Sequence, residues 1–253
     1  MSGKLFYRFL ADAIFDINDP QSMEDKMREN WNNEADITWI DPKKPMVAIS
    51  FDDGPVDPVS ETSPAIRIQN ALRDSGMHAT FFYWGNTFNE GTRAEIERAQ
   101  ELGFEIANHT KTHSHLPELS VEEMKAEVDF MLPVLKEISG REKFLLRPPY
   151  LDVNEALRDM IDVPLISCGL DSMDWAQATA KQMIDKIAKA CENDSLDGKI
   201  VLMHETYDAT AEAVEFLVPY LKEKGYQVVT ISEMFKARGK DMKAGEVYGA
   251  CPQ

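Results

Sequence analysis

Short apolar runs alternate along this sequence with longer segments that have the periodicity of amphipathic helices. Seven runs have the length and the β-branched or aromatic content of buried strands, and they are 46–51, 78–84, 104–107, 144–146, 164–168, 199–203 and 227–231. Strands that alternate with helices pair in parallel, with the helices packed outside. The pattern therefore predicts an α/β fold, an incomplete or distorted (β/α) barrel, with a doubly wound open sheet as the alternative.

The helices between these runs are marked by capping signals. Ser120 and Glu123 have the spacing of a capping box, and so do Thr179 and Gln182. Pro133 is expected to kink the helix that Ser120 begins. The other helical segments are expected at 61–75, 90–101, 154–161, 208–224 and 232–238.

The two ends of the chain differ from the barrel region. Residues 1–44 are polar and acidic and form an N-terminal extension, with an amphipathic helix predicted over Leu5–Ile17. Charged residues interrupt this apolar stretch, so it does not match a signal peptide, and the chain is expected to be cytoplasmic or a mature or trimmed form. The barrel domain is placed at 45–238, and 239–253 is predicted to be a C-terminal tail.

The acidity of the chain limits its partners. It has 27 Lys and Arg against 44 Asp and Glu, a net charge of −17, so nucleic acid and anionic lipid would repel it. No apolar run approaches the roughly 20 residues that a membrane span requires. The cysteines have no metal-binding spacing and are expected to be two core thiols and one tail thiol, at Cys168, Cys191 and Cys251.

Most of the predicted strands end in polar clusters that core packing would not select. In parallel α/β proteins the carboxyl ends of the strands meet at one edge, where active sites are assembled. The clusters follow five of the seven runs and lie at 52–55, 108–113, 147–150, 171–175 and 204–205. We therefore expect these segments to form one site.

Two of the clusters contain candidate metal ligands. His109 and His113 are four residues apart, so on a helical turn both rings would project from one face and could bind one ion. Asp52 and Asp53 are neighbours at a strand end, so their side chains are expected to point in different directions. One carboxylate could then bind the metal while the other faces the bound water. Two imidazoles and a carboxylate suit zinc, and also non-haem iron, cobalt or nickel.

Five short motifs, in this order, closely resemble those of the polysaccharide deacetylase family, the NodB-homology domain or carbohydrate esterase family 4. They are SFDDGP at 50–55, HTKTH at 109–113, RPPY at 147–150, DSMDW at 171–175 and LMH at 202–204. The resemblance covers about residues 45–236. It implies that 45–238 is a metal-dependent catalytic domain with a distorted (β/α)7 barrel, in agreement with the seven predicted strands.

The resemblance also implies roles for residues of the first three motifs. It makes Asp53, His109 and His113 the ligands of a divalent metal, for which Zn²⁺ is preferred and Co²⁺ or Ni²⁺ are alternatives. Asp52 resembles the general base that takes a proton from a metal-activated water. Arg147 resembles the residue that orients this base, a task that suits its rigid, planar side chain.

The remaining implied roles concern the leaving group and the substrate. His204 resembles the general acid, with Asp174 holding its other ring nitrogen and Asp171 as the alternative partner. The backbone N–H of Tyr150 would stabilise the oxyanion together with the metal. The side chains expected to line the pocket for the acetyl methyl group are Trp175 and Leu202.

These roles imply a hydrolase that removes N-acetyl groups from GlcNAc units of chitin oligomers or peptidoglycan. An O-acetyl esterase acting on acetylated xylan uses the same motifs and stays open as the alternative. An inactive carbohydrate-binding relative is disfavoured because every catalytic residue type is present, and a Ser-His-Asp hydrolase because no GxSxG elbow occurs. The resemblance implies an extracellular or cell-envelope enzyme, provided that the chain is a mature or trimmed form.

Several residues near the motifs receive no catalytic role. His78 and His115 have no comparable context and are expected to be structural or at the surface. Leu151 and Asp152 follow the RPPY motif where the family often has Gly, so the shape of the adjoining groove loop does not follow from the resemblance. The segments 85–90 and 205–208 lie after predicted strands and are candidates for substrate contact.

Overall fold

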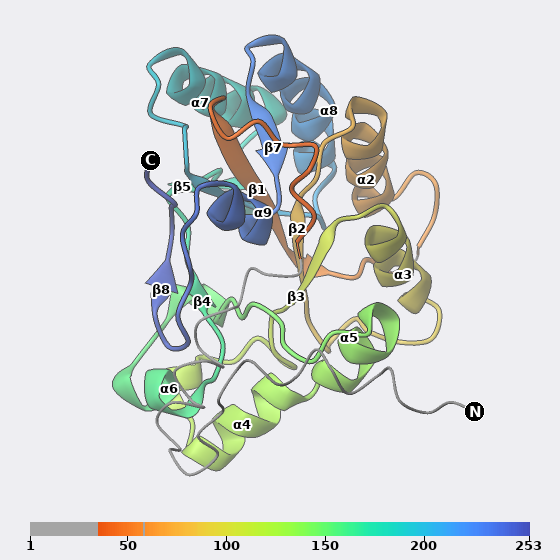
Figure 1. Ribbon diagram of the computed structural model, residues 1–253. Coiled ribbons are helices and arrows are strands. Elements are labelled where there is room, and N and C mark those ends of the chain that lie inside the picture. The colour runs from red at the N-terminus through yellow and green to blue at the C-terminus, as the bar shows by residue number, and fades with distance from the viewer. Residues whose placement is uncertain (1–34, 58) are drawn as a thin grey trace, which may run out of the picture.

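The computed structural model describes residues 35–57 and 59–253, and the helix predicted over Leu5–Ile17 lies outside them (Figure 1). The strands of the described residues are β1 Met46–Gly54, β2 Thr80–Tyr83, β3 Glu105–Asn108, β4 Leu165–Ile166, β5 Leu170–Asp171, β6 Ile200–His204, β7 Gln227–Val229 and β8 Val247–Tyr248. The helices are α2 Pro64–Ser75, α3 Arg93–Glu101, α4 Val121–Asp129, α5 Leu132–Ser139, α6 Glu155–Met160, α7 Ala180–Glu192, α8 Asp208–Glu223 and α9 Ile231–Ala237.

β1 is the long central strand of a curved parallel sheet. One edge of β1 pairs with β6. Along the other edge, the first half of β1 pairs with β7 and the second half pairs with β2. β3 extends the sheet beyond β2, and β5 extends it beyond β6. Isolated bridges through Leu146 then connect Asn108 of β3 to Leu165 of β4. The strand order thus curves around a core and confirms the prediction of a distorted barrel over that of an open sheet.

The C-terminal segment closes this barrel and is not a tail. β8 pairs in parallel with β4, and Gly249 accepts a hydrogen bond from Ile200 of β6 at 3.1 Å. This segment therefore connects the strands β4 and β6 (Figure 1). The two backbones approach so closely here that a Cβ atom on Gly169 would lie only 2.5 Å from the Gly249 carbonyl oxygen. Glycine is therefore needed at position 169. Cys251, predicted to be a tail thiol, has no exposed surface, and Cys191 is only 5% exposed. The prediction of a tail over 239–253 is therefore wrong.

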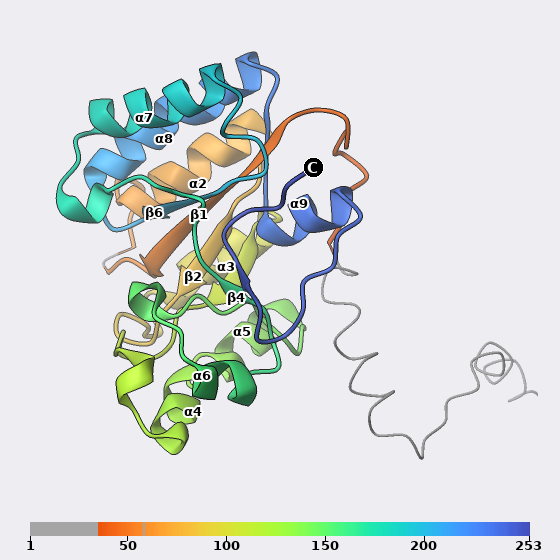
Figure 2. The ribbon, with the colours of Figure 1, turned by 90° about the vertical axis from the view of Figure 1, so that its left-hand side faces the viewer.

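Four of the helices flank the central strand β1 on two sides. α2, α7 and α8 lie side by side on one side of β1, and α9 lies on the other (Figure 2). The apolar core beneath the first group includes Phe51 and Phe81, whose rings stack with centroids 5.0 Å apart. A smaller core under α9 includes Met234 and Ile40, the latter from the predicted N-terminal extension.

The predicted helix boundaries hold where the chain carries strong caps. Ser120 and Thr179 both form the capping boxes expected of them, at the starts of α4 and α7. The helix expected to kink at Pro133 is instead interrupted, so that α4 ends at Asp129 and α5 begins at Leu132. The interruption has a physical reason, because proline has no N–H to donate and clashes with the preceding turn.

Two further observations bound the fold. The predicted strand 144–146 contributes only the bridges of Leu146, and the short strand β5 was not predicted. Within residues 35–57 and 59–253, no helix combines the length and the apolar content needed to cross a lipid bilayer.

Candidate active site

The predicted site residues meet at the carboxyl ends of the parallel strands. Asp52 and Asp53 lie near the end of β1, His109 directly follows β3, and His204 is the last residue of β6. Arg147 directly follows Leu146, whose isolated bridges connect β3 to β4. Parallel pairing places all these strand ends at the same edge of the barrel, as the sequence predicts.

The end of β1 carries an irregularity that brings both aspartates to the same place. The register of β1 against β2 shifts between Asp52 and Gly54, and Asp53 has a φ of 67°, in the left-handed region. A bulge of this kind re-aims the side chain that it carries. Consequently Asp52 Oδ2 and Asp53 Oδ1 lie 3.7 and 3.5 Å from His109 Nε2. The expectation that the two carboxylates diverge is therefore wrong.

Asp53, His109 and His113 form a cluster that could hold a metal ion. Their candidate ligand atoms all lie within 4.8 Å of one another, and Asp53 Oδ1 lies 3.7 Å from His113 Nε2. Asp53 Oδ1 is buried and has no hydrogen-bond partner among the described residues. His109 Nδ1 lies 2.7 Å from the Arg147 carbonyl oxygen, which can only accept, so Nδ1 carries the proton and Nε2 is free to bind a metal. The donor set fits a divalent ion with open positions for water and substrate.

The path between the two histidines differs from the predicted helical turn. Residues 109–113 form a loop, in which Thr110 and His113 have φ values of 68° and 60°. Glu127 of α4 accepts hydrogen bonds from the backbone N–H groups of Lys111 and Thr112, at 3.1 and 2.8 Å. The rings of His109 and His113 therefore come together because hydrogen bonds to Glu127 hold the loop between them, and not because they lie on one face of a helix.

Arg147 is held in a single orientation beneath the site. Its side chain has no exposed surface, and its two terminal nitrogens donate to Asp52 Oδ1 at 2.6 Å and to Ser50 Oγ at 2.9 Å. The guanidinium also lies over the Phe82 ring, 4.2 Å from its centroid. The result is a fixed Asp52 carboxylate whose second oxygen faces His109.

His204 and Asp174 form a second buried pair. Asp174 Oδ1 lies 2.8 Å from His204 Nδ1, while Oδ2 accepts hydrogen bonds from the His204 backbone and the Thr210 hydroxyl. Burial alone would lower the pKa of His204, but the bond to Asp174 and the charges of Asp52 and Asp53 outweigh it and raise that pKa to about 9. The ring is therefore protonated at neutral pH and able to donate a proton.

The structure decides between the two carboxylates considered as partners of His204. Asp171 accepts hydrogen bonds from the Trp175 indole nitrogen at 3.1 Å and from the backbone of Met173 at 2.7 Å. Asp174, not Asp171, contacts His204.

The side chains predicted to contact substrate differ in exposure. Tyr150 and Trp175 are 56% and 53% exposed, whereas Leu202 is 6% exposed. The Tyr150 ring meets His113 edge-on, with centroids 4.6 Å apart. His115, expected to be structural or at the surface, is exposed, and its ring stacks on Tyr150. No local signal indicates this contact, because the two residues belong to different loops.

A buried acidic group, Glu205, packs against the end of β1. Glu205, a candidate for substrate contact, is fully buried, and neither of its carboxylate oxygens has a partner among the described residues. A Cβ atom on Gly54 would lie 1.6 Å from Glu205 Oε1. Burial, and then the charge of Glu95, raise the pKa of Glu205 well above its usual range. Glu205 is therefore packed inside the fold against the aspartate loop, and the expectation of substrate contact is wrong for it.

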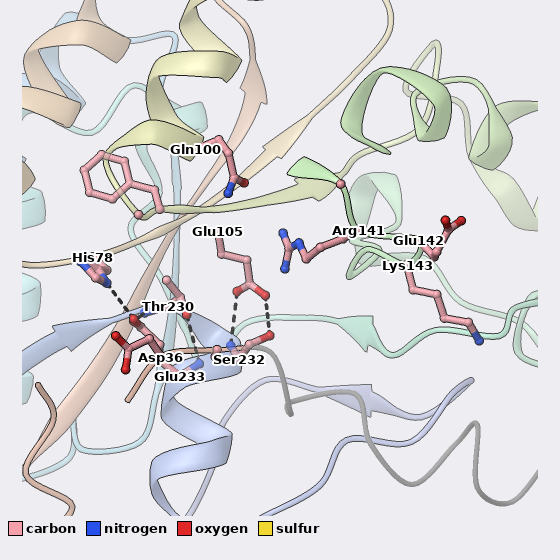
Figure 3. A pocket seen from close by; sticks show the side chains of 14 residues that line it. Asp36, His78, Gln100, Glu105, Arg141, Glu142, Lys143, Thr230, Ser232 and Glu233 are labelled. Atoms are coloured by element: carbon pink, nitrogen blue, oxygen red, sulfur yellow. Dashed lines mark hydrogen bonds and ion pairs between the residues drawn. The ribbon is translucent and has the colours of Figure 1, made fainter. Parts of the chain in front are cut away.

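A cavity of about 560 Å³ lies beside the amino ends of β2 and β3 (Figure 3). It is lined by Glu105, the first residue of β3, whose carboxylate accepts hydrogen bonds from Thr80 and Ser232. His78 lies on the same wall, with Nδ1 2.7 Å from Glu233 Oε1, which agrees with the structural role expected for it. This polar cavity is thus separate from the metal-ligand cluster, which follows the opposite end of β3.

Comparison with known proteins is consistent with this geometry. The sequence profile of the family described as Polysaccharide deacetylase matches residues 40–162. The chain is similar to the Peptidoglycan-N-acetylmuramic acid deacetylase PdaC of Bacillus subtilis (strain 168), with 31% identity over 195 residues, which cover 77% of this chain and 40% of that protein. It is also similar to the Bifunctional xylanase/deacetylase of Pseudobutyrivibrio xylanivorans, with 29% identity over 197 residues, 77% of this chain and 31% of that protein.

A solved structure shows the same fold. A family 4 acetyl xylan esterase from Clostridium thermocellum, in complex with a cobalt ion, matches with a TM-score of 0.73 at 28% identity, over 82% of this chain and 100% of that chain. The chain spans less than half the length of the two curated relatives, at 40% and 31%. The profile match nevertheless contains the first three motifs and all three candidate metal ligands. The chain belongs to the polysaccharide deacetylase family.

Proposed function

We propose that this domain hydrolyses N-acetyl groups on amino-sugar units of peptidoglycan or chitin oligomers. The observation that carries the proposal is the placement of two buried pairs, Asp52 with Arg147 and Asp174 with His204, beside one three-ligand cluster. One pair offers a fixed proton acceptor, and the other offers a proton donor. One relative is a peptidoglycan deacetylase and the other a xylanase/deacetylase, which supports an acetylated carbohydrate as the substrate class and a cell-wall or extracellular place of action.

The cluster of Asp53, His109 and His113 would hold the divalent metal, for which we propose Zn²⁺. When bound there, the metal supplies Lewis acidity toward water and toward the acetyl carbonyl. The similarity to a cobalt-containing esterase supports a divalent ion at this place.

The side chains around the cluster divide the proton transfers between them. Asp52, oriented by Arg147, accepts a proton from the attacking water, because its second oxygen faces the ligand His109. The backbone N–H of Tyr150 stabilises the negative charge that develops on the carbonyl oxygen. His204, protonated and held by Asp174, then donates a proton to the departing amine.

The Asp174–His204 pair favours an amide over an ester as substrate. An amine is a poor leaving group unless it is protonated, whereas the alkoxide of an acetyl ester needs less help. Trp175 and Leu202 are proposed to border the acetyl methyl group, one from the exposed rim and one from the buried wall. Deacetylation of acetylated xylan is the second candidate, because one relative is a xylanase/deacetylase and the matched structure is a xylan esterase.

The test measures acetate released by the Zn²⁺-loaded protein from GlcNAc oligomers, peptidoglycan fragments and acetylated xylan. Release from either amino-sugar substrate that Asp52→Asn removes supports the proposal, since this change leaves the three metal ligands in place. Release from xylan alone would instead establish the second candidate. Release from none of the three substrates would refute both.

A further inference from the structure

The loop that begins at Arg147 contains two consecutive residues in the left-handed region. Tyr150 has a φ of 59° and Leu151 a φ of 60°. Side chains other than glycine adopt this region with difficulty, because Cβ comes too close to the backbone. Backbone hydrogen bonds tighten the turn, with Leu151 N–H donating to Pro148 at 3.0 Å and Asp152 N–H to Pro149 at 3.1 Å. Such a conformation persists only where surrounding contacts enforce it.

His115 makes two contacts that span this turn. Its ring stacks face to face on Tyr150, with centroids 3.7 Å apart and planes at 8°. Its Nδ1 lies 2.6 Å from Asp152 Oδ2. The contacts therefore fall on the residues just before and just after Leu151. A rotation of φ at either left-handed residue would move Tyr150 relative to Asp152, and His115 could then not keep both partners.

The turn is also coupled to the metal-ligand cluster. The Tyr150 ring packs edge-on against the ligand His113, two residues before His115. At its other end, the turn follows Arg147, whose carbonyl oxygen accepts a hydrogen bond from His109. The buried end is thus fixed by the site itself, and the exposed end is fixed by His115 and Asp152, which are each more than 40% exposed.

We propose that His115 is a positioning residue, which together with Asp152 holds the left-handed Tyr150–Leu151 turn so that the Tyr150 backbone N–H faces the substrate carbonyl. This proposal rests on the proposed function, in which that N–H stabilises the oxyanion. His115 itself touches no reacting atom and acts through Tyr150. A displacement of the turn by about 1 Å is enough to lower the rate by up to roughly 100-fold.

The test compares His115→Ala, which removes both contacts, with His115→Phe, which keeps an aromatic ring for stacking but removes the contact with Asp152. Leu151→Gly is added to the wild type and to His115→Ala, because glycine enters the left-handed region without steric penalty. The matched control is His78→Ala, since His78 has a similar pairing with Glu233, at 2.7 Å, at the far end of the barrel.

In the Zn²⁺-loaded full chain acting on GlcNAc oligomers, kcat should fall about 10- to 100-fold in His115→Ala, with KM changed less than about threefold. His115→Phe should lie between this variant and the wild type. Leu151→Gly should restore part of the lost kcat in the His115→Ala background. His78→Ala should keep kcat within about twofold of the wild type, because it alters only a distant pair.

Two results overturn the proposal: an unchanged kcat in His115→Ala, or a loss that Leu151→Gly does not relieve. If the wild type releases no acetate from any substrate, the proposed function fails, and hydrogen exchange of the peptide covering 148–153 decides the role of His115 alone. Exchange there should be faster in His115→Ala than in the wild type and unchanged in His78→Ala. Equal exchange in all three proteins would rule out that His115 holds the turn.

Discussion

Asp174 holds His204 at two points, because one carboxylate oxygen contacts the imidazole Nδ1 at 2.8 Å and the other accepts the His204 backbone N–H at 2.6 Å. The ring and the main chain of His204 are therefore fixed by a single side chain. This arrangement orients the other ring nitrogen and stabilises the protonated ring, which are the two properties that a general acid needs.

The first prediction concerns the pH dependence of activity. The pKa of His204 is raised to about 9, so kcat/KM should decline as the pH rises through that value and the acid loses its proton. Asp174→Asn should move this alkaline limb to lower pH and reduce the rate below it by about 100-fold. Asp171→Asn is the matched control, since Asp171 contacts Trp175 and not His204, and the limb should stay in place. An unmoved limb in Asp174→Asn would exclude His204 as the group that titrates there.

The second prediction concerns the pH dependence of stability. The folded-state pKa of His204 lies above the value of about 6.5 that an unfolded chain has, so its stabilising contribution is complete below about pH 6.5. It is lost as the pH rises toward 9, and amounts to on the order of 3 kcal/mol. Urea denaturation between pH 6 and 10 should show a steeper loss of unfolding free energy for the wild type than for Asp174→Asn. Parallel curves for the two proteins would contradict this assignment.

The third prediction concerns Arg147. Lysine offers no planar pair of donors, so Arg147→Lys should leave the Asp52 carboxylate or the Ser50 hydroxyl without the donor that Arg147 supplies in a buried place. The expected cost is about 3 kcal/mol in the free energy of unfolding, with acetate release reduced at least 10-fold. Arg67→Lys, which alters an exposed ion pair with Glu215, should cost less than about 1 kcal/mol. Equal costs for the two substitutions, measured by urea denaturation, would show that burial of Arg147 has no energetic consequence.

The fourth prediction concerns the metal ligands. A metal that binds the folded state alone raises the melting temperature, so Zn²⁺ should stabilise the wild type against heat and chelation with EDTA should abolish acetate release. His113→Ala should lose both the thermal shift and the bound zinc that elemental analysis detects after dialysis. His78→Ala should keep them, because His78 lies by the distant cavity. Stoichiometric zinc in His113→Ala would remove His113 from the ligand set.

The fifth prediction concerns Gly54. An alanine Cβ would overlap Glu205 and come within 2.9 Å of the Tyr83 ring, so Gly54→Ala should destabilise the fold by about 1–3 kcal/mol. It should also displace the aspartate loop and lower activity. Because the clash is with Glu205, the double variant Gly54→Ala/Glu205→Ala should lose less unfolding free energy than the sum of the losses in the two single variants. The difference should be at least about 0.5 kcal/mol. Strict additivity in denaturant unfolding would place the strain elsewhere.

The sequence predicts the site better than it predicts the local backbone that builds it. Parallel strands must bring their carboxyl ends to one edge, so Asp53, His109 and His113 meet as predicted. The bulge that turns Asp53 toward His109 is a conformational event at a single residue, and no periodic pattern encodes it. The left-handed residues of the histidine loop, such as Thr110, are equally hidden, because the loop is held by a glutamate from α4.

The missed parts of the fold have similar causes. β8 has two residues, too few for any alternation of polar and apolar side chains to show. Its position is set by close backbone contacts, which glycines at 169 and 249 allow. The stacking of His115 on Tyr150 joins two loops that are distant in sequence. Long-range relationships of this kind become visible only when the topology is known.

The closing role of β8 bears on how the domain matures during translation. Gly198 donates a hydrogen bond to Met46 at the start of β1, and Cys251 donates to Gly198, so residues from both ends of the described barrel meet in one seam. The ribosome delivers the chain from its N-terminus, so β4 and β6 emerge well before the segment that bridges them. Until residues 247–251 have been made, both edges carry unpaired backbone groups that a neighbouring nascent chain can engage. The barrel therefore closes only when residues 247–251 have paired with β4 and with Ile200 of β6.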